Sequence, residues 1–148
     1  MHMLTIRTVL LRETASLPTY GSDAAAGADL HACLDAPVTI APGQTVLIPT
    51  GVAMEIPFGY AGLVYARSGL SVKRDLAPAN KVGVIDADYR GEIFVPLHNH
   101  GQTVQTVEHG ERIAQMIVTA CPETQFVQSD TLSDTARGTG GFGSTGTK

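Results

Sequence analysis

Apolar and polar residues alternate with a period of two along much of the chain, which predicts β-strands rather than helices. The clearest runs are short and rich in β-branched residues, and we expect strands over 45–48, 90–97, 102–107 and 112–119. Turn residues bound these runs and recur about every ten residues, the spacing of a sandwich, jelly roll or small barrel. The pattern therefore predicts an all-β, antiparallel domain.

Two segments depart from this alternation. Ser68 to Asp75 begins with a residue type that caps helices and ends before Pro78, which predicts one short helix. From Arg137 onward five of the twelve residues are glycine, and such a segment contributes little to a core. We therefore expect one domain, with a β-barrel over residues 1–136 and a mobile, flexible Gly-rich C-terminal arm over 137–148.

Composition narrows the functional classes. The 148 residues are 43% hydrophobic and 16% charged, which excludes an intrinsically disordered chain. The net charge of −4 argues against direct nucleic-acid binding, and no apolar run is long enough for a membrane span. The first residues do not have the pattern of a secretory signal. We expect a cytoplasmic protein in which Cys33 and Cys121 are reduced, packed thiols.

The segment from Lys81 to Ile93 contains several side chains that could act in catalysis or binding. Two apolar runs flank Asp86, Asp88 and Tyr89, which predicts a β-hairpin with acids and an aromatic ring at its tip. Such a tip is either a solvated turn or a carboxylate that holds a water beside a nucleoside. Gly83, within the first run, indicates a close approach by another backbone or by a ligand.

Three further segments are ambiguous when taken alone. Arg67, next to Ser68 and Gly69, suits either anion binding or a surface ion pair. Gln115 shares a strand face with apolar residues, so its amide is either satisfied internally or faces a ligand. The paired imidazoles of His98 and His100 lack further metal-ligand spacing, which favours an ordinary surface over a metal site.

Taken together and in order, these segments resemble the trimeric dUTP diphosphatases (dUTPases). Five segments carry the resemblance, which extends from about residue 4 to the end of the chain. They are Ala26–Leu30, Arg67–Leu70, Gly83–Gly91, Gly110–Gln115 and Arg137–Gly146. The main departure is Ala66, where a proline is common in the family.

The resemblance implies an antiparallel jelly roll of the β-clip type, assembled as a homotrimer whose active sites are shared between chains. It also implies hydrolysis of dUTP to dUMP and pyrophosphate, with Asp86 holding the water that attacks the α-phosphorus. Mg²⁺ bridges the phosphates in the family, and Asp29 matches the acid that reaches the metal through water. Lowering dUTP would keep uracil out of DNA and supply dUMP for thymidylate synthesis.

Substrate contacts are also implied by the resemblance. For the phosphates they are Arg67, Ser68, Gly69, Gln115, Arg137, Gly143, Ser144 and Thr145. For the base and sugar they are Asn80, Gly83, Val84, Ile85, Tyr89 and Phe142. Tyr89 is expected to pack under the deoxyribose and exclude a 2′-hydroxyl, and Phe142 to stack over the uracil.

Two alternatives remain open. The first is an enzyme of the same fold that deaminates dCTP, which the Asp86–Tyr89 tip and the arm disfavour. The second is a nucleotide-binding regulatory protein, which the intact Asp86 and arm also disfavour.

Overall fold

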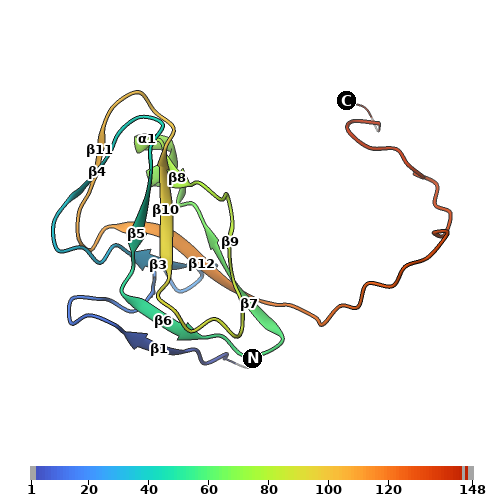
Figure 1. Cartoon of the computed structure of the whole chain (residues 1–148), viewed down its shortest axis with the longest axis horizontal. Helices are drawn as coiled ribbons and strands as arrows, with labels where there is room; N and C mark the ends of the chain where they lie inside the picture. Colours follow the sequence, from blue (N-terminus) through green and yellow to red (C-terminus); the bar gives the residue numbers. More distant parts are fainter. Residues whose placement is uncertain (1–2, 145, 147–148) are drawn as a thin grey trace.

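The structure is a computed structural model that describes residues 3–144 and residue 146. The described residues form twelve strands and one helix, α1 (Ser68–Arg74) (Figure 1). The strands are β1 (Arg7–Leu10), β2 (Thr19–Tyr20), β3 (Ala28–His31), β4 (Val38–Ile40), β5 (Thr45–Pro49), β6 (Val52–Glu55), β7 (Tyr60–Tyr65), β8 (Leu76–Pro78), β9 (Gly83–Ile85), β10 (Phe94–Asn99), β11 (Gln105–Val107) and β12 (Arg112–Ala120). All their pairings are antiparallel, which confirms the predicted all-β class with one short helix.

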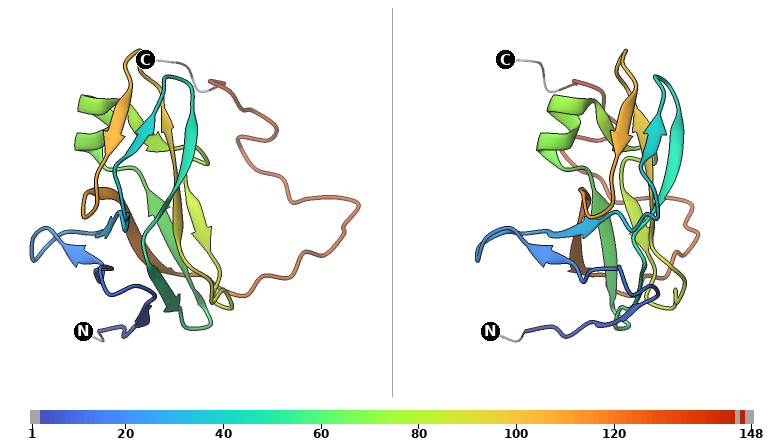
Figure 2. Two further views of the ribbon diagram at one scale, coloured as in Figure 1. Left: turned by 60° about the vertical axis from the view of Figure 1, so that its left-hand side comes forward. Right: turned by 90° about the vertical axis from the view of Figure 1, so that its left-hand side faces the viewer.

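The strands form four sheets that share one core. The largest sheet has the order β2-β3-β12-β7-β9, and the next has the order β5-β10-β8. The two remaining pairs are β1-β6 and β11-β4. Fully buried Leu30, Ile48, Leu97 and Ile113 come from different strands and belong to one apolar cluster, which joins the sheets into the folded body seen in Figure 2.

The predicted hairpin around Asp86 is wrong. Strand β9 pairs with β7, with Gly83 opposite Val64, whereas β10 pairs with β5 and β8 in another sheet. A Cβ on Gly62 would lie 3.3 Å from the Cβ of Ile85, so a glycine in β7 lets β9 come close. Residues 86–93 therefore form a loop between two sheets, because a non-local partner outcompetes the nearby one.

Two strand boundaries also differ from the predicted ones. The strand expected over 90–97 spans Phe94–Asn99, and the one expected over 102–107 spans Gln105–Val107. The first residues of each predicted run lie in connecting loops. Boundaries shift because hydrogen-bonded partners, which local alternation does not reveal, decide where a strand begins.

The short helix lies where the sequence predicted it, but its cap does not. Arg67 is the N-cap residue and makes no side-chain capping bond, so the predicted role of Ser68 as a cap is wrong. The helix ends at Asp75, which has a left-handed φ of 52° and donates its backbone N–H to Leu70 O. Leu70 is buried and attaches the helix to the core.

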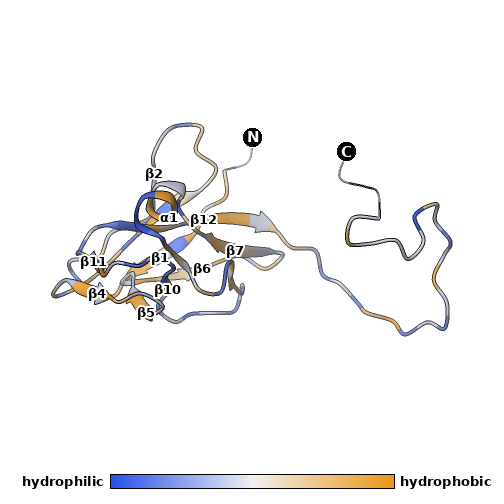
Figure 3. Ribbon diagram, turned by 90° about the horizontal axis from the view of Figure 1, so that it is seen from above, coloured by the Kyte–Doolittle hydropathy of each residue, from blue (hydrophilic) through white to orange (hydrophobic). Residues whose placement is uncertain are grey.

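The chain after Ala120 leaves the folded body. Residues 121–144 contain no helix or strand and extend away from the sheets (Figure 1). Three apolar side chains along this extension, Phe126, Val127 and Leu132, are exposed, and Figure 3 shows the corresponding apolar stretches. Within the single chain, they therefore contribute nothing to the core.

The structure also bears on membrane-spanning helices and on the two cysteines. No helix among the described residues is long and apolar enough to span a membrane. Cys33 is buried, as predicted, whereas Cys121 is exposed directly after β12, so its predicted packing is wrong. Period-two alternation places Cys121 near a strand but does not reveal that the strand ends one residue earlier.

Candidate active site

Asp29 of β3 and Gln115 of β12 are paired across neighbouring strands. Both line a cavity of about 210 Å³ that we call the arginine pocket. Its lining residues are Gly21, Ser22, Ala25, Gly27, Asp29, Arg67, Ser68, Gly69, Arg112 and Gln115. The fold therefore brings five of the predicted site residues together from three elements far apart in sequence.

Two guanidinium groups flank one carboxylate in this pocket. Arg67 Nε donates a hydrogen bond to Asp29 Oδ1 at 2.7 Å, and Arg112 Nη1 lies 3.5 Å from Asp29 Oδ2. The Asp29 side chain is only 9% exposed, and a carboxylate so buried requires compensating partners. Two cations against one anion leave the pocket with excess positive charge, although the whole chain has a net charge of −4. The pocket is therefore suited to an anionic ligand.

Gln115 is both partnered and turned toward the pocket. Its Nε2 donates a hydrogen bond to the Ala66 carbonyl at 2.9 Å. A Cβ on Gly27 would lie 2.7 Å from Gln115 Oε1, so a glycine at this position leaves room for the amide. The amide is therefore satisfied internally, and the residue also lines the arginine pocket.

A second cavity, which we call the tyrosine pocket, has a volume of about 220 Å³. Its lining residues are Val84, Ile85, Asp86, Tyr89, Glu92, Ile93 and Phe94. Asp86 immediately follows β9, so the strand delivers this carboxylate to the edge of the cavity. The carboxylate and the aromatic ring that the sequence singled out thus share one cavity.

Short contacts hold the loop that carries Asp86. Tyr89 donates its backbone N–H to Asp86 O at 3.1 Å, and its hydroxyl donates to the Glu92 carbonyl at 2.8 Å. A Cβ on Gly91 would lie 2.7 Å from Tyr89 Cζ, so the ring passes directly over this glycine. The loop is folded back on itself, and Gly91 makes that possible.

Asn80 and Gly83 lie beside the tyrosine pocket and are not part of its lining. Asn80 belongs to the turn before β9, where Lys81 has a left-handed φ of 66°. A Cβ on Gly83 would lie 3.3 Å from Val64 Cβ and 3.4 Å from Asn80 Nδ2. The close approach that the sequence indicated at Gly83 therefore comes from the neighbouring strand and from Asn80.

The Gly-rich arm is brought to neither pocket. Arg137 donates its Nε hydrogen to Gly140 O at 2.8 Å, and Ser144 donates its backbone N–H to Gly141 O, so the arm's contacts are local. Phe142 is fully exposed, and Gly143 follows it with a φ of 88°. Figure 1 shows the described part of this segment lying apart from the sheets. Thr145 lies outside the described residues.

The arginine and tyrosine pockets have no lining residue in common. Asp86 and Tyr89 therefore lie in one cavity, while Arg67 and Gln115 lie in another. One chain does not unite the predicted catalytic, base-binding and phosphate-binding groups in a single cavity.

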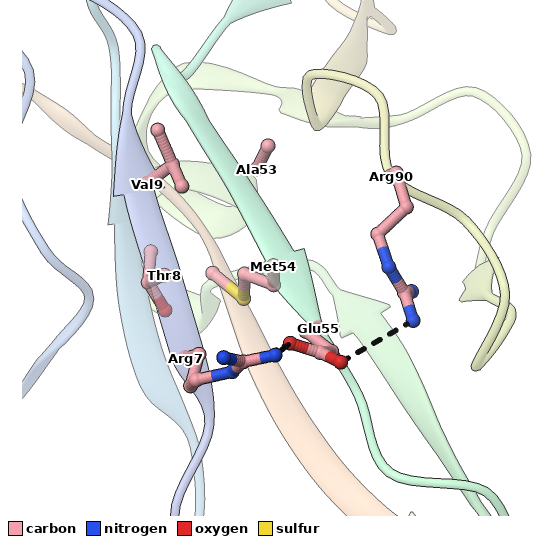
Figure 4. A pocket seen from close by; sticks show the side chains of 7 residues that line it. All are labelled: Arg7, Thr8, Val9, Ala53, Met54, Glu55 and Arg90. Carbon is pink, nitrogen blue, oxygen red and sulfur yellow. Dashed lines mark hydrogen bonds and ion pairs between the residues drawn. The ribbon is translucent and has the colours of Figure 1, made fainter.

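A third cavity of about 320 Å³ lies between β1 and β6 (Figure 4). Its lining residues are Arg7, Thr8, Val9, Ala53, Met54, Glu55 and Arg90. Glu55 pairs with Arg7 and lies 3.8 Å from Arg90, and these side chains are 40–80% exposed. Exposed pairs of this kind contribute little free energy, because the surrounding water and salt screen their charges. The cavity is a weaker candidate than the other two, although Arg90 links the Asp86 loop to β6.

Two basic groups near these pockets have shifted pKa values. Burial lowers the pKa of His31 below 6.5, and its Nδ1 has no hydrogen-bond partner within residues 3–144 or residue 146. Contacts with Cys33 and Glu92 raise the pKa of Arg12.

Three charged residues of the arginine and tyrosine pockets or their borders were not singled out from the sequence. They are Arg112 beside Asp29, Glu92 in the tyrosine pocket and Arg12, which pairs with Glu92. Arg112 lies in the Gly110–Gln115 segment, so its position in that motif could have identified it as a site residue. Arg12 and Glu92 are 80 residues apart, and no local pattern connects them.

The described residues contain no cluster of three or more His, Cys, Asp or Glu side chains able to hold a metal. Mg²⁺ retains most of its waters and needs few protein ligands. Each Asp29 oxygen faces one guanidinium and has a remaining lone pair for a metal-bound water. The arginine pocket therefore fits a Mg²⁺ ion held mainly by phosphate oxygens.

The sequence profile of the dUTPase family matches residues 13–146. The chain belongs to the dUTPase family. It is 51% identical over 134 residues to the deoxyuridine 5′-triphosphate nucleotidohydrolase of Desulfotalea psychrophila, covering 90% of this chain and 89% of the relative. It is 48% identical to the same enzyme of Desulfitobacterium hafniense, covering 99% of each chain.

Solved dUTPases have the same fold. The dUTPase of Staphylococcus bacteriophage 80alpha with dUpNHpp superposes with a TM-score of 0.90 and 28% identity, covering 97% of this chain and 99% of the phage chain. A variant dUTPase from phage phi11 of S. aureus, with a structural Mg(II) ion, superposes with a TM-score of 0.79 and 25% identity. It covers 86% of this chain and 98% of its own. The predicted jelly-roll fold is thereby confirmed.

Proposed function

We propose that the protein hydrolyses dUTP to dUMP and pyrophosphate. The observation that carries the proposal is the pair of cavities, one with excess positive charge and one with a carboxylate beside an aromatic ring. The relatives named above have the same activity in their names. The proposed role is to keep uracil out of DNA and to provide dUMP.

Asp86 acts as the general base in this proposal. It holds a water molecule and accepts its proton as the water oxygen bonds to the α-phosphorus. The bond from that phosphorus to the oxygen bridging toward the β-phosphate breaks, and pyrophosphate leaves as an anion. A positioned base of this kind contributes about 10²–10⁴-fold to the rate.

The arginine pocket receives the phosphates. Arg67 is anchored through Nε to Asp29 and through Nη1 to the Arg112 carbonyl, which leaves Nη2 and the second Nη1 hydrogen to donate to phosphate oxygens. Gln115 lines the same cavity and provides a further amide donor. The other phosphate contacts in the proposal are Ser68, Gly69, Arg137, Gly143, Ser144 and Thr145. Together these residues would neutralise the negative charge of the leaving pyrophosphate.

Mg²⁺ is the proposed cofactor. Its charge would neutralise the triphosphate and favour the departure of pyrophosphate. Asp29, almost buried in the arginine pocket, would bind a water of the ion.

The tyrosine pocket and its borders select the base and the sugar. Tyr89 lies under the deoxyribose and leaves no space for a 2′-hydroxyl. The backbone of Gly83, Val84 and Ile85, with Asn80, pairs with the uracil edge and crowds its C5 position. Phe142 then stacks over the base when the arm closes. Buried polar groups left without partners would reject cytosine.

A homotrimer with shared sites reconciles these roles with the single chain. The two pockets have no residue in common, and the arm extends away from both. In the proposed assembly, one chain provides the arginine pocket, a second the tyrosine pocket and a third the arm. The exposed Phe126 and Val127 would then pack against a neighbouring chain.

Pyrophosphate release tests the proposal. The chain is incubated with Mg²⁺ and, separately, with dUTP, dTTP, dCTP and UTP, and ammonia is measured in the dCTP sample. We expect release from dUTP alone. Ammonia from dCTP would point to a deaminase, and binding of dUTP without release would point to a regulatory protein.

A further inference from the structure

Glu92 is held in a fixed position at the border of the tyrosine pocket. Its Oε1 accepts hydrogen bonds from Arg12 Nη1 at 2.8 Å and from the Gly51 backbone N–H at 2.8 Å. Its Oε2 lies 3.3 Å from Arg12 Nη2, so the guanidinium binds both oxygens. The Glu92 side chain is 13% exposed. A bidentate pair in such a shielded position restricts orientation strongly.

The same residue ends the loop that carries Asp86. Glu92 directly follows Gly91, and its carbonyl accepts the Tyr89 hydroxyl hydrogen at 2.8 Å. Its side chain lines the tyrosine pocket together with Asp86 and Tyr89. A displacement of Glu92 is therefore transmitted directly to the Tyr89 ring.

The other end of the ion pair is attached to the folded body. Leu11, next to Arg12, donates its backbone N–H to Gly51 O at 2.8 Å. Gly51 has a φ of 69°, and a Cβ there would lie 2.7 Å from Ala15 Cβ, so this turn is tightly packed. Arg12 and Gly51 thus present three donor groups to Glu92 from one tightly packed turn region.

We infer that Arg12 and Glu92 are positioning residues that fix the 86–91 loop, so that the Tyr89 ring keeps its place in the tyrosine pocket. Their function is to maintain the discrimination between deoxyribose and ribose that we assigned to Tyr89. The inference rests on the proposed role of Tyr89 and adds two residues outside the dUTPase motifs. Neither of them has a proposed contact with the substrate; they act through the position of the loop.

The fold itself does not depend on this ion pair. Ile93 is attached independently, because the Thr50 hydroxyl donates to the Ile93 carbonyl at 2.6 Å and the Ile93 N–H donates to Val52 O. Removal of the Arg12 charge therefore leaves β10 and the core attached. Within the described residues, the remaining side-chain ion pair of the loop is the longer contact between Arg90 and Glu55, at 3.8 Å.

The test compares Arg12→Gln, Glu92→Gln and the double variant in the full-length protein. The measured quantity is the ratio of kcat/KM for dUTP to kcat/KM for UTP. Arg7→Gln is the matched control, because it removes an Arg–Glu pair of similar chemistry from the exposed β1–β6 pocket. Tyr89→Ala is the benchmark for loss of sugar discrimination. Circular dichroism and thermal melting establish that each variant is folded at the assay temperature.

We expect each single variant to lower the ratio by about 10-fold, since misplacement by about 1 Å costs up to about 10²-fold. The double variant should be no worse than either single, because both remove one interaction. Arg7→Gln should keep the wild-type ratio. A wild-type ratio in folded Arg12→Gln, with a reduced ratio in Tyr89→Ala, would overturn the inference. A wild-type ratio in Tyr89→Ala would instead overturn the proposed role of Tyr89.

Discussion

Arg67 and Asp29, 38 residues apart in sequence, are joined by a 2.7 Å hydrogen bond from Nε to Oδ1. The carboxylate is almost buried and Arg112 lies on its other oxygen, so Asp29 organises both cations of the arginine pocket. The Arg67 guanidinium is held through Nε and through an Nη1 bond to the Arg112 carbonyl, so its direction is fixed while Nη2 is left for a ligand. Three segments that are separate in sequence thus contribute Asp29, Arg67 and Arg112 to one network of ion pairs.

Asp29→Asn should therefore impair substrate binding and stability together. We expect a KM for dUTP at least about 10-fold higher, because Arg67 loses its anchor, and a free energy of unfolding about 1–3 kcal/mol lower. Steady-state pyrophosphate release and urea unfolding measure the two effects. Arg112→Gln is the companion variant and should raise KM with a smaller loss of stability, since its side chain is half exposed. An unchanged KM in Asp29→Asn would contradict the anchoring role.

Asp86→Asn should separate binding from chemistry. The amide is nearly isosteric but does not accept a proton, so we expect the affinity for dUpNHpp to stay near the wild-type value. Turnover should fall by about 10²–10⁴-fold. Isothermal titration calorimetry and pyrophosphate release measure the two quantities. A wild-type rate would remove Asp86 as the base.

Deletion of residues 137–148 should abolish most activity and leave the fold intact. The described residues of the arm make local hydrogen bonds and none belongs to the apolar core cluster, so circular dichroism and melting temperature should match the full-length chain. Arg137 and Phe142 would be lost from the site, so the rate should fall sharply. Light scattering should give a trimer for both proteins. Full activity without the arm would show that it has no part in the site.

Gly27→Ala should act through Gln115. The new methyl group would lie 2.7 Å from Gln115 Oε1 and 3.2 Å from Gln115 Cβ, so the amide must move and the neighbouring Cβ must shift slightly. We expect a folded protein with a higher KM for dUTP. Gly21→Ala is the matched control, because it lines the same pocket with no atom within 4 Å of the new Cβ. Equal KM values for the two variants would argue against this steric effect.

Acid should destabilise the protein through His31. Burial lowers its pKa below 6.5 in the folded state, aided by the charges of Arg112 and Arg67 and opposed by Asp29. Below pH 6.5 the unfolded chain therefore binds more protons than the folded one, and stability falls as the pH decreases. Melting temperatures from pH 8 to pH 5 should fall less steeply in His31→Gln than in the wild type. Parallel curves would show that His31 stays neutral or charged equally in both states.

The strand-rich class, the short helix and the identity of the motif residues follow from local patterns in the chain. These depend on local quantities: a period of two, turn residues and short runs of specific side chains. Alternation located β5 and β12 almost to their ends, and the order of five motifs indicated the dUTPases before any geometry was known.

Which side chains come into contact depends on the packing of distant segments. Pairing of β9 with β7 replaced the expected hairpin, because the glycine at 62 admits Ile85 from a distant segment. Arg12 donates a hydrogen bond to Glu92, 80 residues away in sequence, and Arg67 donates one to Asp29, 38 residues away. Hydrogen bonds and ion pairs between distant segments depend on how the sheets pack around the core, and no local pattern in the chain encodes that packing.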